Sequence, residues 1–350
     1  MDIVTGLAVD RPDPNGPYRI TAELINTDIG SQSEGINVNY IELQGDSMFT
    51  AVRDGKRRSS NSLYAGALET VIISNQIAKD EGVLSILEQL FSSPEPRETI
   101  EVVVSQEKSA REHFYVEGID TSIPSYEMSE TIAEDKRTVD VTISVPIYKA
   151  YSMAKDEGCT LTLPTVHTAY NLDKLVNETN GLAYFKGDRL AGYLDAEETK
   201  YFLLITGEMK SGPISLYLLE DNPHPVSMNI KKIHSKRELS FEDGQLVFDY
   251  KMSCNINIAE IQDAIDLESL EQRNWLEDEI GGAIEKGIRA SFENMKETGV
   301  DLFSLGQILY RKDHKLWYSC KDSWEDILQH ASIRSDISVT IESIGTIKNY

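Results

Sequence analysis

The stretch QLVFDYKMSCNINIAE, residues 245–260, carries an apolar side chain at every second position from Leu246 to Ile258. Because successive side chains of a strand point to opposite faces, this period predicts one long strand with one buried face. Asp243-Gly244, directly before it, favours a tight hairpin turn. Val226 to Phe241 is therefore predicted to be the partner strand of a long hairpin.

The residues after this hairpin predict a long amphipathic helix, roughly from Leu267 to Lys296. Its apolar residues recur at a spacing that places them on one stripe of a helix. These residues are Leu276, Ile280, Ile284, Ile288, Phe292 and Met295. The chain then alternates like a strand from Ile337 to Ile341. Together these segments predict a C-terminal α+β domain in which a long helix lies on an antiparallel sheet.

The N-terminal half mixes two kinds of strand connection. Val4 to Val9 and Tyr18 to Ile25 flank a turn rich in proline and glycine, and Val38 to Leu43 follows as a third strand. Further on, Leu68 to Ile73 and Ile100 to Val104 are strand-like runs with a helical stretch between them. A meander combined with a β–α–β connection predicts an α+β or mixed-sheet domain.

Local signals place further elements in this half. Ser47 is expected to cap a short helix. Residues 75–91 are predicted to be helical, with Gly82 as an interruption. Residues 139–143 alternate like a strand, and a helix is expected from Pro146, since proline is tolerated in a first turn.

Length and charge bound the class of protein. At 350 residues the chain exceeds one ordinary core, and we expect three domains, residues 1–125, 126–224 and 225–350. The net charge of −24 disfavours nucleic acid as a partner and argues against a basic membrane-surface patch. No stretch approaches the roughly 20 apolar residues of a membrane span. Because Met1 runs straight into a strand-like segment, we expect that a targeting segment has been removed.

Sequence signatures of catalysis and of metal binding are missing. Motifs for a nucleophile elbow, a phosphate loop, a dinucleotide fold and a zinc protease do not occur. The cysteines Cys159, Cys254 and Cys320 are far apart and odd in number, so neither a zinc site nor a complete disulfide framework is expected. Cys254 is predicted to lie in the core. We expect no enzyme, no metal and no cofactor.

Two clusters leave alternatives open. Asp195, Glu197 and Glu198 could supply paired carboxylates, but a helix that Asp195 caps explains them better. Trp317 and Trp324 are seven residues apart and can share one helix face. Core packing is the first interpretation of the two tryptophans, and an exposed anchor for a partner protein is the second.

Several segments, in this order, resemble the Ger(x)C family of spore germination proteins. The stretch GLAYFKGDRLAGYLDAEET, residues 181–199, is similar to the family's G-x-A-x-F-K-x-D-K-L-x-G-Y-L-x-x-x-E-T. GLAVD at residues 6–10, GDSMFTA at residues 45–51 and DLFSLG at residues 301–306 resemble further blocks. Single matches follow at Arg311, Trp317, Trp324, Asp336 and Gly345.

The chain also departs from the family's pattern. Ala67-Leu68-Glu69 stands where the family often has His-Leu-Lys, and Ser92-Ser93 where it often has Arg-Asp. The lipid-attachment cysteine and the short motif after it are absent from the sequence. If the replaced polar residues serve a shared interaction, this chain has changed it.

The resemblance implies a three-domain α+β lipoprotein, the C subunit of a nutrient germinant receptor. Such a subunit is tethered by an N-terminal lipid to the outer face of the spore inner membrane. It works beside A- and B-type membrane subunits, and it has no known catalytic residues to carry over. In this reading Gly192, Tyr193, Trp317 and Trp324 are the residues for partner docking.

Two other classes of function stay open. A germinant-binding module would hold the small molecule itself, in a concave site with a few convergent polar groups. A cell-envelope hydrolase would direct carboxylates such as Asp195 and Glu198 into one groove.

Overall fold

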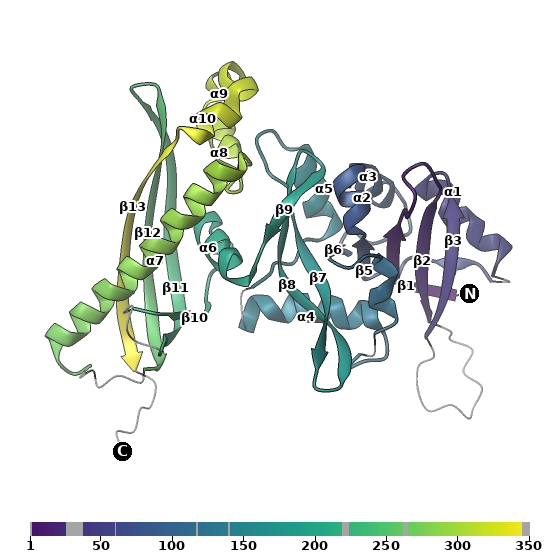
Figure 1. The fold of residues 1–350 in the computed structure, drawn as a ribbon, viewed down its shortest axis with the longest axis horizontal. Helices are drawn as coiled ribbons and strands as arrows, with labels where there is room; N and C mark the ends of the chain where they lie inside the picture. Colours follow the sequence, from purple (N-terminus) through teal and green to yellow (C-terminus); the bar gives the residue numbers. More distant parts are fainter. Residues whose placement is uncertain are drawn as a thin grey trace. The chain divides into compact units, whose positions relative to one another are not determined.

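Within the part of the chain that the structure describes, a nine-stranded and a four-stranded sheet organise two units (Figure 1). The structure is a computed structural model that describes residues 2–25, 38–59, 61–116, 118–138, 141–218, 224–261, 265 and 267–344. The first unit comprises residues 1–135, 141–156 and 160–196. The second comprises residues 136–140, 157–159 and 197–350.

The sheet of the first unit is mixed. Its strands are β1 (Asp2–Asp10), β2 (Tyr18–Ile25), β3 (Val38–Gly45), β4 (Leu63–Tyr64), β5 (Thr70–Ile73), β6 (Glu101–Ser105), β7 (Thr162–Asn171), β8 (Lys174–Lys186) and β9 (Arg189–Leu194). Their order is β3-β2-β1-β5-β6-β7-β8-β9, and β4 pairs with β1. The central strands β1, β5, β6 and β7 are parallel, and antiparallel meanders flank them.

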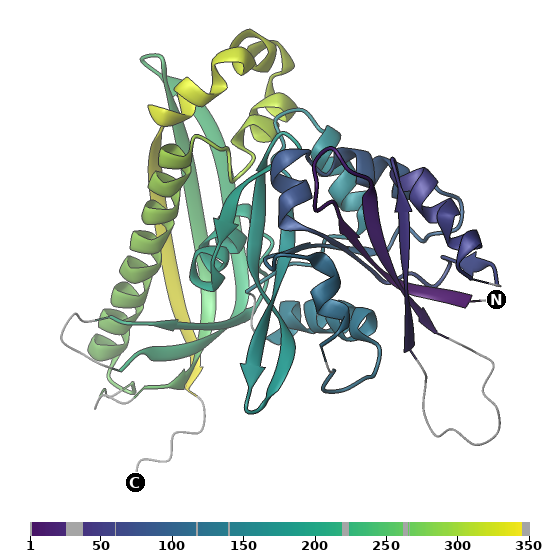
Figure 2. The ribbon, with the colours of Figure 1, turned by 45° about the vertical axis from the view of Figure 1, so that its right-hand side comes forward.

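Helices cover both faces of this sheet. They are α1 (Met48–Asp54), η1 (Gly55–Arg57), α2 (Asn75–Asp80), α3 (Leu84–Phe91), η2 (Ala110–Phe114), α4 (Pro124–Thr138) and α5 (Ile147–Lys155). Figures 1 and 2 show α4 on one side of the sheet and α2, α3 and α5 on the other. Burial of both faces explains why β5 and β6 are continuous apolar runs rather than alternating ones.

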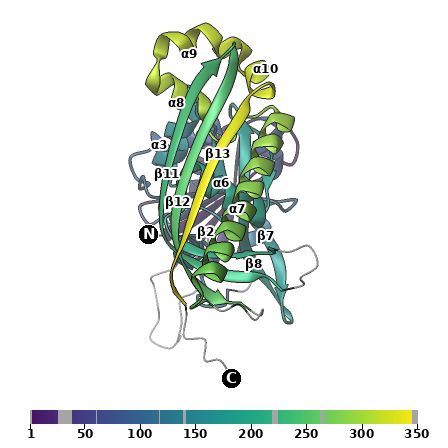
Figure 3. The same ribbon diagram turned by 90° about the vertical axis from the view of Figure 1, so that its left-hand side faces the viewer.

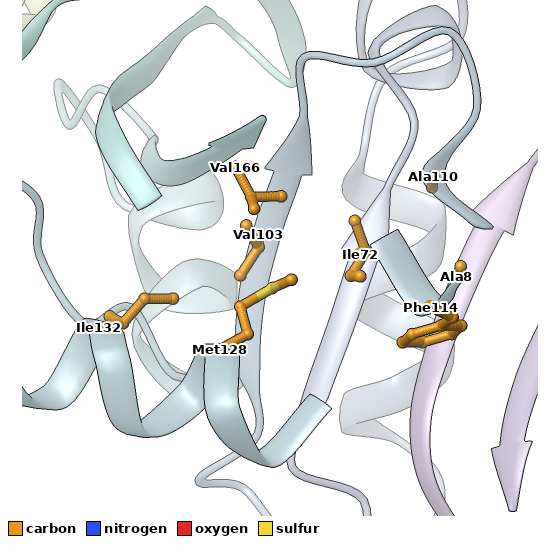
Figure 4. Close-up of a cluster of buried hydrophobic side chains, with 8 residues drawn as sticks. All are labelled: Ala8, Ile72, Val103, Ala110, Phe114, Met128, Ile132 and Val166. Atoms are coloured by element: carbon orange, nitrogen blue, oxygen red, sulfur yellow. The ribbon is translucent and has the colours of Figure 1, made fainter. Parts of the chain in front are cut away.

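The core between the sheet and helix α4 joins strands and helices that are far apart in sequence. Ala8, Ile72, Val103 and Val166 come from the four parallel strands, and Figure 4 shows them against side chains of η2 and α4. Those side chains are Ala110, Phe114, Met128 and Ile132. This cluster packs η2 and α4 against the sheet.

Two local predictions are confirmed. The Ser47 hydroxyl accepts the Thr50 N–H at 3.2 Å, and the Thr50 hydroxyl accepts the Ser47 N–H at 3.0 Å, which completes a capping box at α1. Gly82 separates α2 from α3, because its φ of +93° lies outside the range of a helix. This backbone conformation is strained for residues with a side chain, so glycine suits the position.

The strand predicted for residues 139–143 is wrong for the residues that the structure describes. Residues 139 and 140 lie outside the described chain, and residues 141–145 form no strand. The backbone N–H groups of Val141 and Thr142 instead donate to Asp135 Oδ2, each at 2.9 Å. The predicted helix after Pro146 is confirmed as α5.

The second unit has the predicted long hairpin and helix. Its strands are β10 (Gly212–Leu216), β11 (Val226–Glu242), β12 (Gln245–Glu260) and β13 (Ser332–Ile344). Its helices are α6 (Ala196–Thr206), α7 (Leu270–Thr298), α8 (Leu305–Lys312), α9 (His314–Cys320), η3 (Lys321–Ser323) and α10 (Trp324–Gln329). Figure 3 shows α7 beside β13, along the sheet. All six residues of the predicted apolar stripe are buried, and so is Cys254.

One feature of this sheet corrects the sequence analysis. β10, β11 and β12 are antiparallel, but β13 pairs with β12 in parallel. The helices α7 to α10 form a crossover that returns the chain to the end of the sheet at which β12 starts, so β13 runs in the same direction. The sheet is therefore mixed.

The α+β class with mixed sheets is confirmed. The division at residues 125 and 224 stays a prediction, although β7, β8 and β9 continue the sheet that begins with β1. In the described residues, no helix combines the length and the apolar character that crossing a bilayer requires.

Candidate functional site

An apolar cavity of about 560 Å³ lies in the first unit. Its floor belongs to β1, β2 and β3, and α1 and α3 form its walls. Side chains of the floor and walls are almost fully buried and purely hydrocarbon: Val4, Leu7, Ala22, Leu43, Leu68 and Leu90. Small-molecule sites typically measure about 300–1,000 Å³ and have apolar walls. The cavity therefore has the size and the lining of a ligand site.

Helix α1 supplies one side of the cavity mouth. Met48 and Ala51 point into the core, so Phe49, Val52 and Arg53 are left at the surface. Phe49 and Val52 are 48% and 45% exposed and lie one turn apart, so they form an apolar surface beside the cavity. The Arg53 guanidinium lies over the Phe49 ring, 4.0 Å from its centroid. This stacking holds a cation at the mouth.

The other side of the mouth is polar. Gln89 lies in the last turn of α3, and Ser92, Ser93 and Glu95 follow that helix. The Ser93 hydroxyl donates to the Gln89 carbonyl at 2.7 Å, and Glu95 Oε2 accepts the Ala65 N–H at 3.4 Å. Ser92 and Ser93 are two of the positions at which the chain departs from the Ger(x)C pattern, and both line the cavity.

Gly192 and Tyr193 lie on β9, the edge strand of the described sheet. A Cβ at Gly192 would lie 2.3 Å from the hydroxyl of the buried Tyr184, so a side chain at this position would displace the Tyr184 ring. Tyr193 is half-buried, its hydroxyl has no hydrogen-bond partner among the described residues, and burial raises its pKa to about 12. Packing accounts for both residues, and their role in docking stays a prediction.

Trp317 and Trp324 are both buried. They do not share one helix face, as the spacing suggested, because Trp317 lies in α9 and Trp324 begins α10 after the turn η3. The two rings nevertheless meet edge to face, with centroids 5.2 Å apart. Their indole N–H groups donate to different carboxylates, that of Trp317 to Glu157 and that of Trp324 to Asp301, each at 3.0 Å.

Asp301 is the centre of this tryptophan cluster. Its carboxylate also accepts the N–H groups of Leu305 and Gly306, at 2.8 and 2.7 Å, and so fixes the first turn of α8. Burial raises the pKa of Asp301 to about 6. A Cβ at Gly306 would lie 2.7 Å from the Trp317 ring. The late family-like residues therefore converge on one packed structure, while docking by either tryptophan stays a prediction.

The acidic cluster after Tyr193 lies at a helix start, as predicted. Helix α6 begins at Ala196, with Glu197 and Glu198 in its first turn. Glu197 forms an ion pair with Lys200 at 3.6 Å, and Glu198 accepts the side-chain N–H of Asn294 at 3.0 Å. The two glutamates thus have separate partners rather than one shared groove.

A cluster of Ser105, His113 and Asn177 was not predicted from the sequence. His113 Nε2 lies 2.8 Å from the Ser105 hydroxyl, and His113 Nδ1 lies 2.8 Å from Asn177 Oδ1. This is the connectivity of a Ser–His–Asn triad. Ser105 and His113 are both 0% exposed, however, so a substrate has no access to the hydroxyl. Burial lowers the pKa of His113, and the neutral ring joins β6, η2 and β8. No local motif marks the cluster, because its members are 8 and 64 residues apart.

The β7–β8 hairpin ends in an exposed apolar tip, which we define as Tyr170 and Leu172. In Figures 1 and 2 the hairpin extends beyond the neighbouring strands of its sheet. Tyr170 is 79% exposed and Leu172 is 95% exposed. Leu172 adopts φ +58°, a left-handed conformation that costs a leucine about 1 kcal/mol. Neither burial nor backbone geometry explains a leucine at this position.

Comparisons with known proteins agree with this architecture. The family description "Spore germination protein N-terminal domain" matches residues 1–168, and "Spore germination B3/GerAC like, C-terminal" matches residues 180–345. Spore germination protein KC of Bacillus subtilis (strain 168) is 23% identical over 93% of this chain and 84% of its own. Spore germination protein B3 of the same organism is 20% identical over 99% and 92%.

A solved structure shares the fold. The crystal structure of the GerBC protein superposes with a TM-score of 0.63, covering 96% of this chain and 97% of its own at 17% identity. Fold and family matches together define a spore germination protein of the α+β class. The chain belongs to the Ger(x)C family.

Proposed function

We propose that this chain is the C subunit of a nutrient germinant receptor, a non-enzymatic lipoprotein that docks with A- and B-type membrane subunits. Its place would be the outer face of the spore inner membrane, held by an N-terminal lipid. Membership of the Ger(x)C family supports the role in germination. The Ser–His–Asn cluster and the acidic first turn of α6 are both accounted for as structure, which supports a function other than catalysis.

The observation that carries the docking proposal is the exposed tip of Tyr170 and Leu172. Leu172 is almost fully exposed to water, and its backbone is strained. Its burial against a partner would contribute about 2 kcal/mol to binding. Two neighbouring exposed apolar side chains at the end of a projecting hairpin offer apolar surface that a partner could bury. Gly192 and Tyr193 pair with Tyr184 and Ala183, towards the end of β8 opposite to the tip, so they would form a separate docking region.

Capture of the membrane subunits tests this proposal. The purified chain is immobilised and exposed to detergent-solubilised A- and B-type subunits, with and without nutrients. We expect capture in both conditions, because a docking subunit needs no nutrient to bind. An unrelated acidic protein of similar net charge serves as the control for nonspecific adsorption. Absence of capture in both conditions would contradict the docking role.

The cavity favours a second candidate function, in which the chain itself binds a small molecule. Its volume and its apolar lining support this function independently of the tip. Calorimetric titration of the isolated chain with nutrients separates the two candidates. If a nutrient binds the isolated chain with measurable heat and the membrane subunits are not captured, small-molecule binding is favoured over docking.

A further inference from the structure

We propose that the cavity of the first unit binds an amphiphilic carboxylate, with its hydrocarbon body on the cavity floor and its carboxylate at Arg53. The inference deepens the small-molecule function and is independent of the docking proposal. It assigns to the ligand a chemical class that neither the family nor its relatives' names provide.

The floor selects a hydrocarbon body. Its side chains, from Val4 and Leu7 on β1 to Leu43 on β3, carry no nitrogen or oxygen. A sugar or nucleoside placed there would lose hydrogen bonds to water and regain none from these side chains, at a cost of about 1–3 kcal/mol per polar group. An alkyl or aromatic group loses nothing polar and buries apolar surface. The chemistry of the floor therefore favours an apolar ligand body.

The mouth selects a negatively charged head group. Among the described residues Arg53 has no carboxylate partner, and its guanidinium lies over the Phe49 ring. Its neighbours Arg57 and Arg58, by contrast, both form ion pairs with Asp54, at 3.6 and 3.4 Å. A guanidinium fixed by stacking presents parallel N–H donors that match a carboxylate. Arg53 is thus an unpaired cation at the mouth of an apolar cavity.

A ligand in this position would also cover exposed surface. Phe49 and Val52 lie close to Arg53 on α1, and both are about half exposed. An alkyl chain that enters past them would shield both side chains from water, which adds to binding. Among the described residues that line the cavity, Glu95 is the one group that opposes a negative charge, and it already accepts the Ala65 N–H.

The test is calorimetric titration of the intact chain with three ten-carbon probes that differ only in head group: decanoate, decanol and decylamine. We expect decanoate to bind most tightly, because only its head group pairs with Arg53. Arg53→Gln should weaken decanoate about fivefold and leave decanol unchanged. Arg19→Gln is the matched control, since Arg19 is an exposed arginine on β2 outside the cavity lining.

A second variant tests the location. Val52→Trp replaces a small side chain at the mouth with a large indole ring. Because Val52 is 45% exposed, the substitution should leave folding intact. We expect it to abolish binding of decanoate and decanol alike. The inference is overturned if decanoate gives no heat, if Arg53→Gln and Arg19→Gln bind it equally well, if decylamine binds more tightly than decanoate, or if Val52→Trp still binds it.

Discussion

The indole N–H of Trp324 donates a hydrogen bond of 3.0 Å to the buried carboxylate of Asp301, 23 positions earlier in the chain. The same carboxylate holds the first turn of α8 through two backbone N–H groups. Four of the family-like positions of the C-terminal half, Asp301, Gly306, Trp317 and Trp324, therefore belong to one packed cluster. Their first role is to fix the helices that connect α7 to β13.

Trp324→Phe tests this role. The phenyl ring keeps much of the apolar contact but leaves one lone pair of a buried carboxylate without its donor. We expect the second unit to lose about 1–3 kcal/mol of unfolding free energy, measured by urea denaturation followed by circular dichroism. Trp275→Phe, at a tryptophan that is 41% exposed on α7, is the control and should change stability by less than about 0.5 kcal/mol. Equal effects of the two substitutions would refute the role assigned to the Asp301 hydrogen bond.

The pKa of Asp301 predicts a pH dependence. Its folded-state pKa of about 6 lies above the ordinary value, so the folded state binds the proton more tightly than the unfolded state does. The resulting stabilisation is complete below about pH 4 and is lost as pH rises through about 6. We expect Asp301 to contribute a decrease of about 3 kcal/mol between these limits.

The contribution of Asp301 is measured as the difference between the wild type and Asp301→Asn in urea midpoints at pH 4 to 7.5. The variant should be less stable throughout, since its amide N–H₂ faces backbone donors. Its stability should also lack this downward slope. A slope that persists unchanged in the variant would assign the pH dependence to other groups.

His113 predicts the opposite sign in the first unit. Burial lowers its folded-state pKa, so the unfolded state binds the proton more tightly. Its contribution to stability is present above about pH 6.5 and is lost as pH falls towards the folded-state pKa. His113→Gln should remove this acid-sensitive component, measured by hydrogen exchange of β6 and β8 amides at pH 5 and pH 7.5. Identical pH dependence in the variant and the wild type would rule out His113 as its source.

Two glycines should respond to alanine in opposite directions. At Gly192 a Cβ would clash with the buried Tyr184 ring, so Gly192→Ala should destabilise the first unit by about 1–3 kcal/mol. At Gly282, an exposed position within α7, a Cβ meets open space, so Gly282→Ala should stabilise the second unit by about 0.5–1 kcal/mol. Thermal unfolding of both variants checks the pair. If Gly192→Ala leaves the thermal unfolding of the first unit unchanged, the contact with Tyr184 does not explain the glycine.

Local periodicity predicted the elements whose burial is regular. The alternation of residues 246–258 and the stripe of α7 each repeat over many residues, so the buried face could be assigned from the sequence. Capping by Ser47 was predictable for a similar reason, because the capping box spans only four residues.

Features that depend on distant contacts could not be predicted. The parallel pairing of β13 with β12 follows from the path of four helices, and alternation is the same in parallel and antiparallel strands. Residues 139–143 alternate like a strand, but the backbone N–H groups of Val141 and Thr142 bind Asp135 instead. The His113 cluster and the cavity both combine residues from several elements, so neither leaves a motif.

Binding of the tip variants to the solubilised A- and B-type membrane subunits tests the central claim most directly. The affinity of the wild-type chain is compared with those of Leu172→Ser and of Leu270→Ser, a matched control at a leucine that is 72% exposed in the second unit. The docking account predicts that Leu172→Ser weakens binding about tenfold or more, while Leu270→Ser binds like the wild type. Equal affinity of all three chains would contradict docking through the hairpin tip.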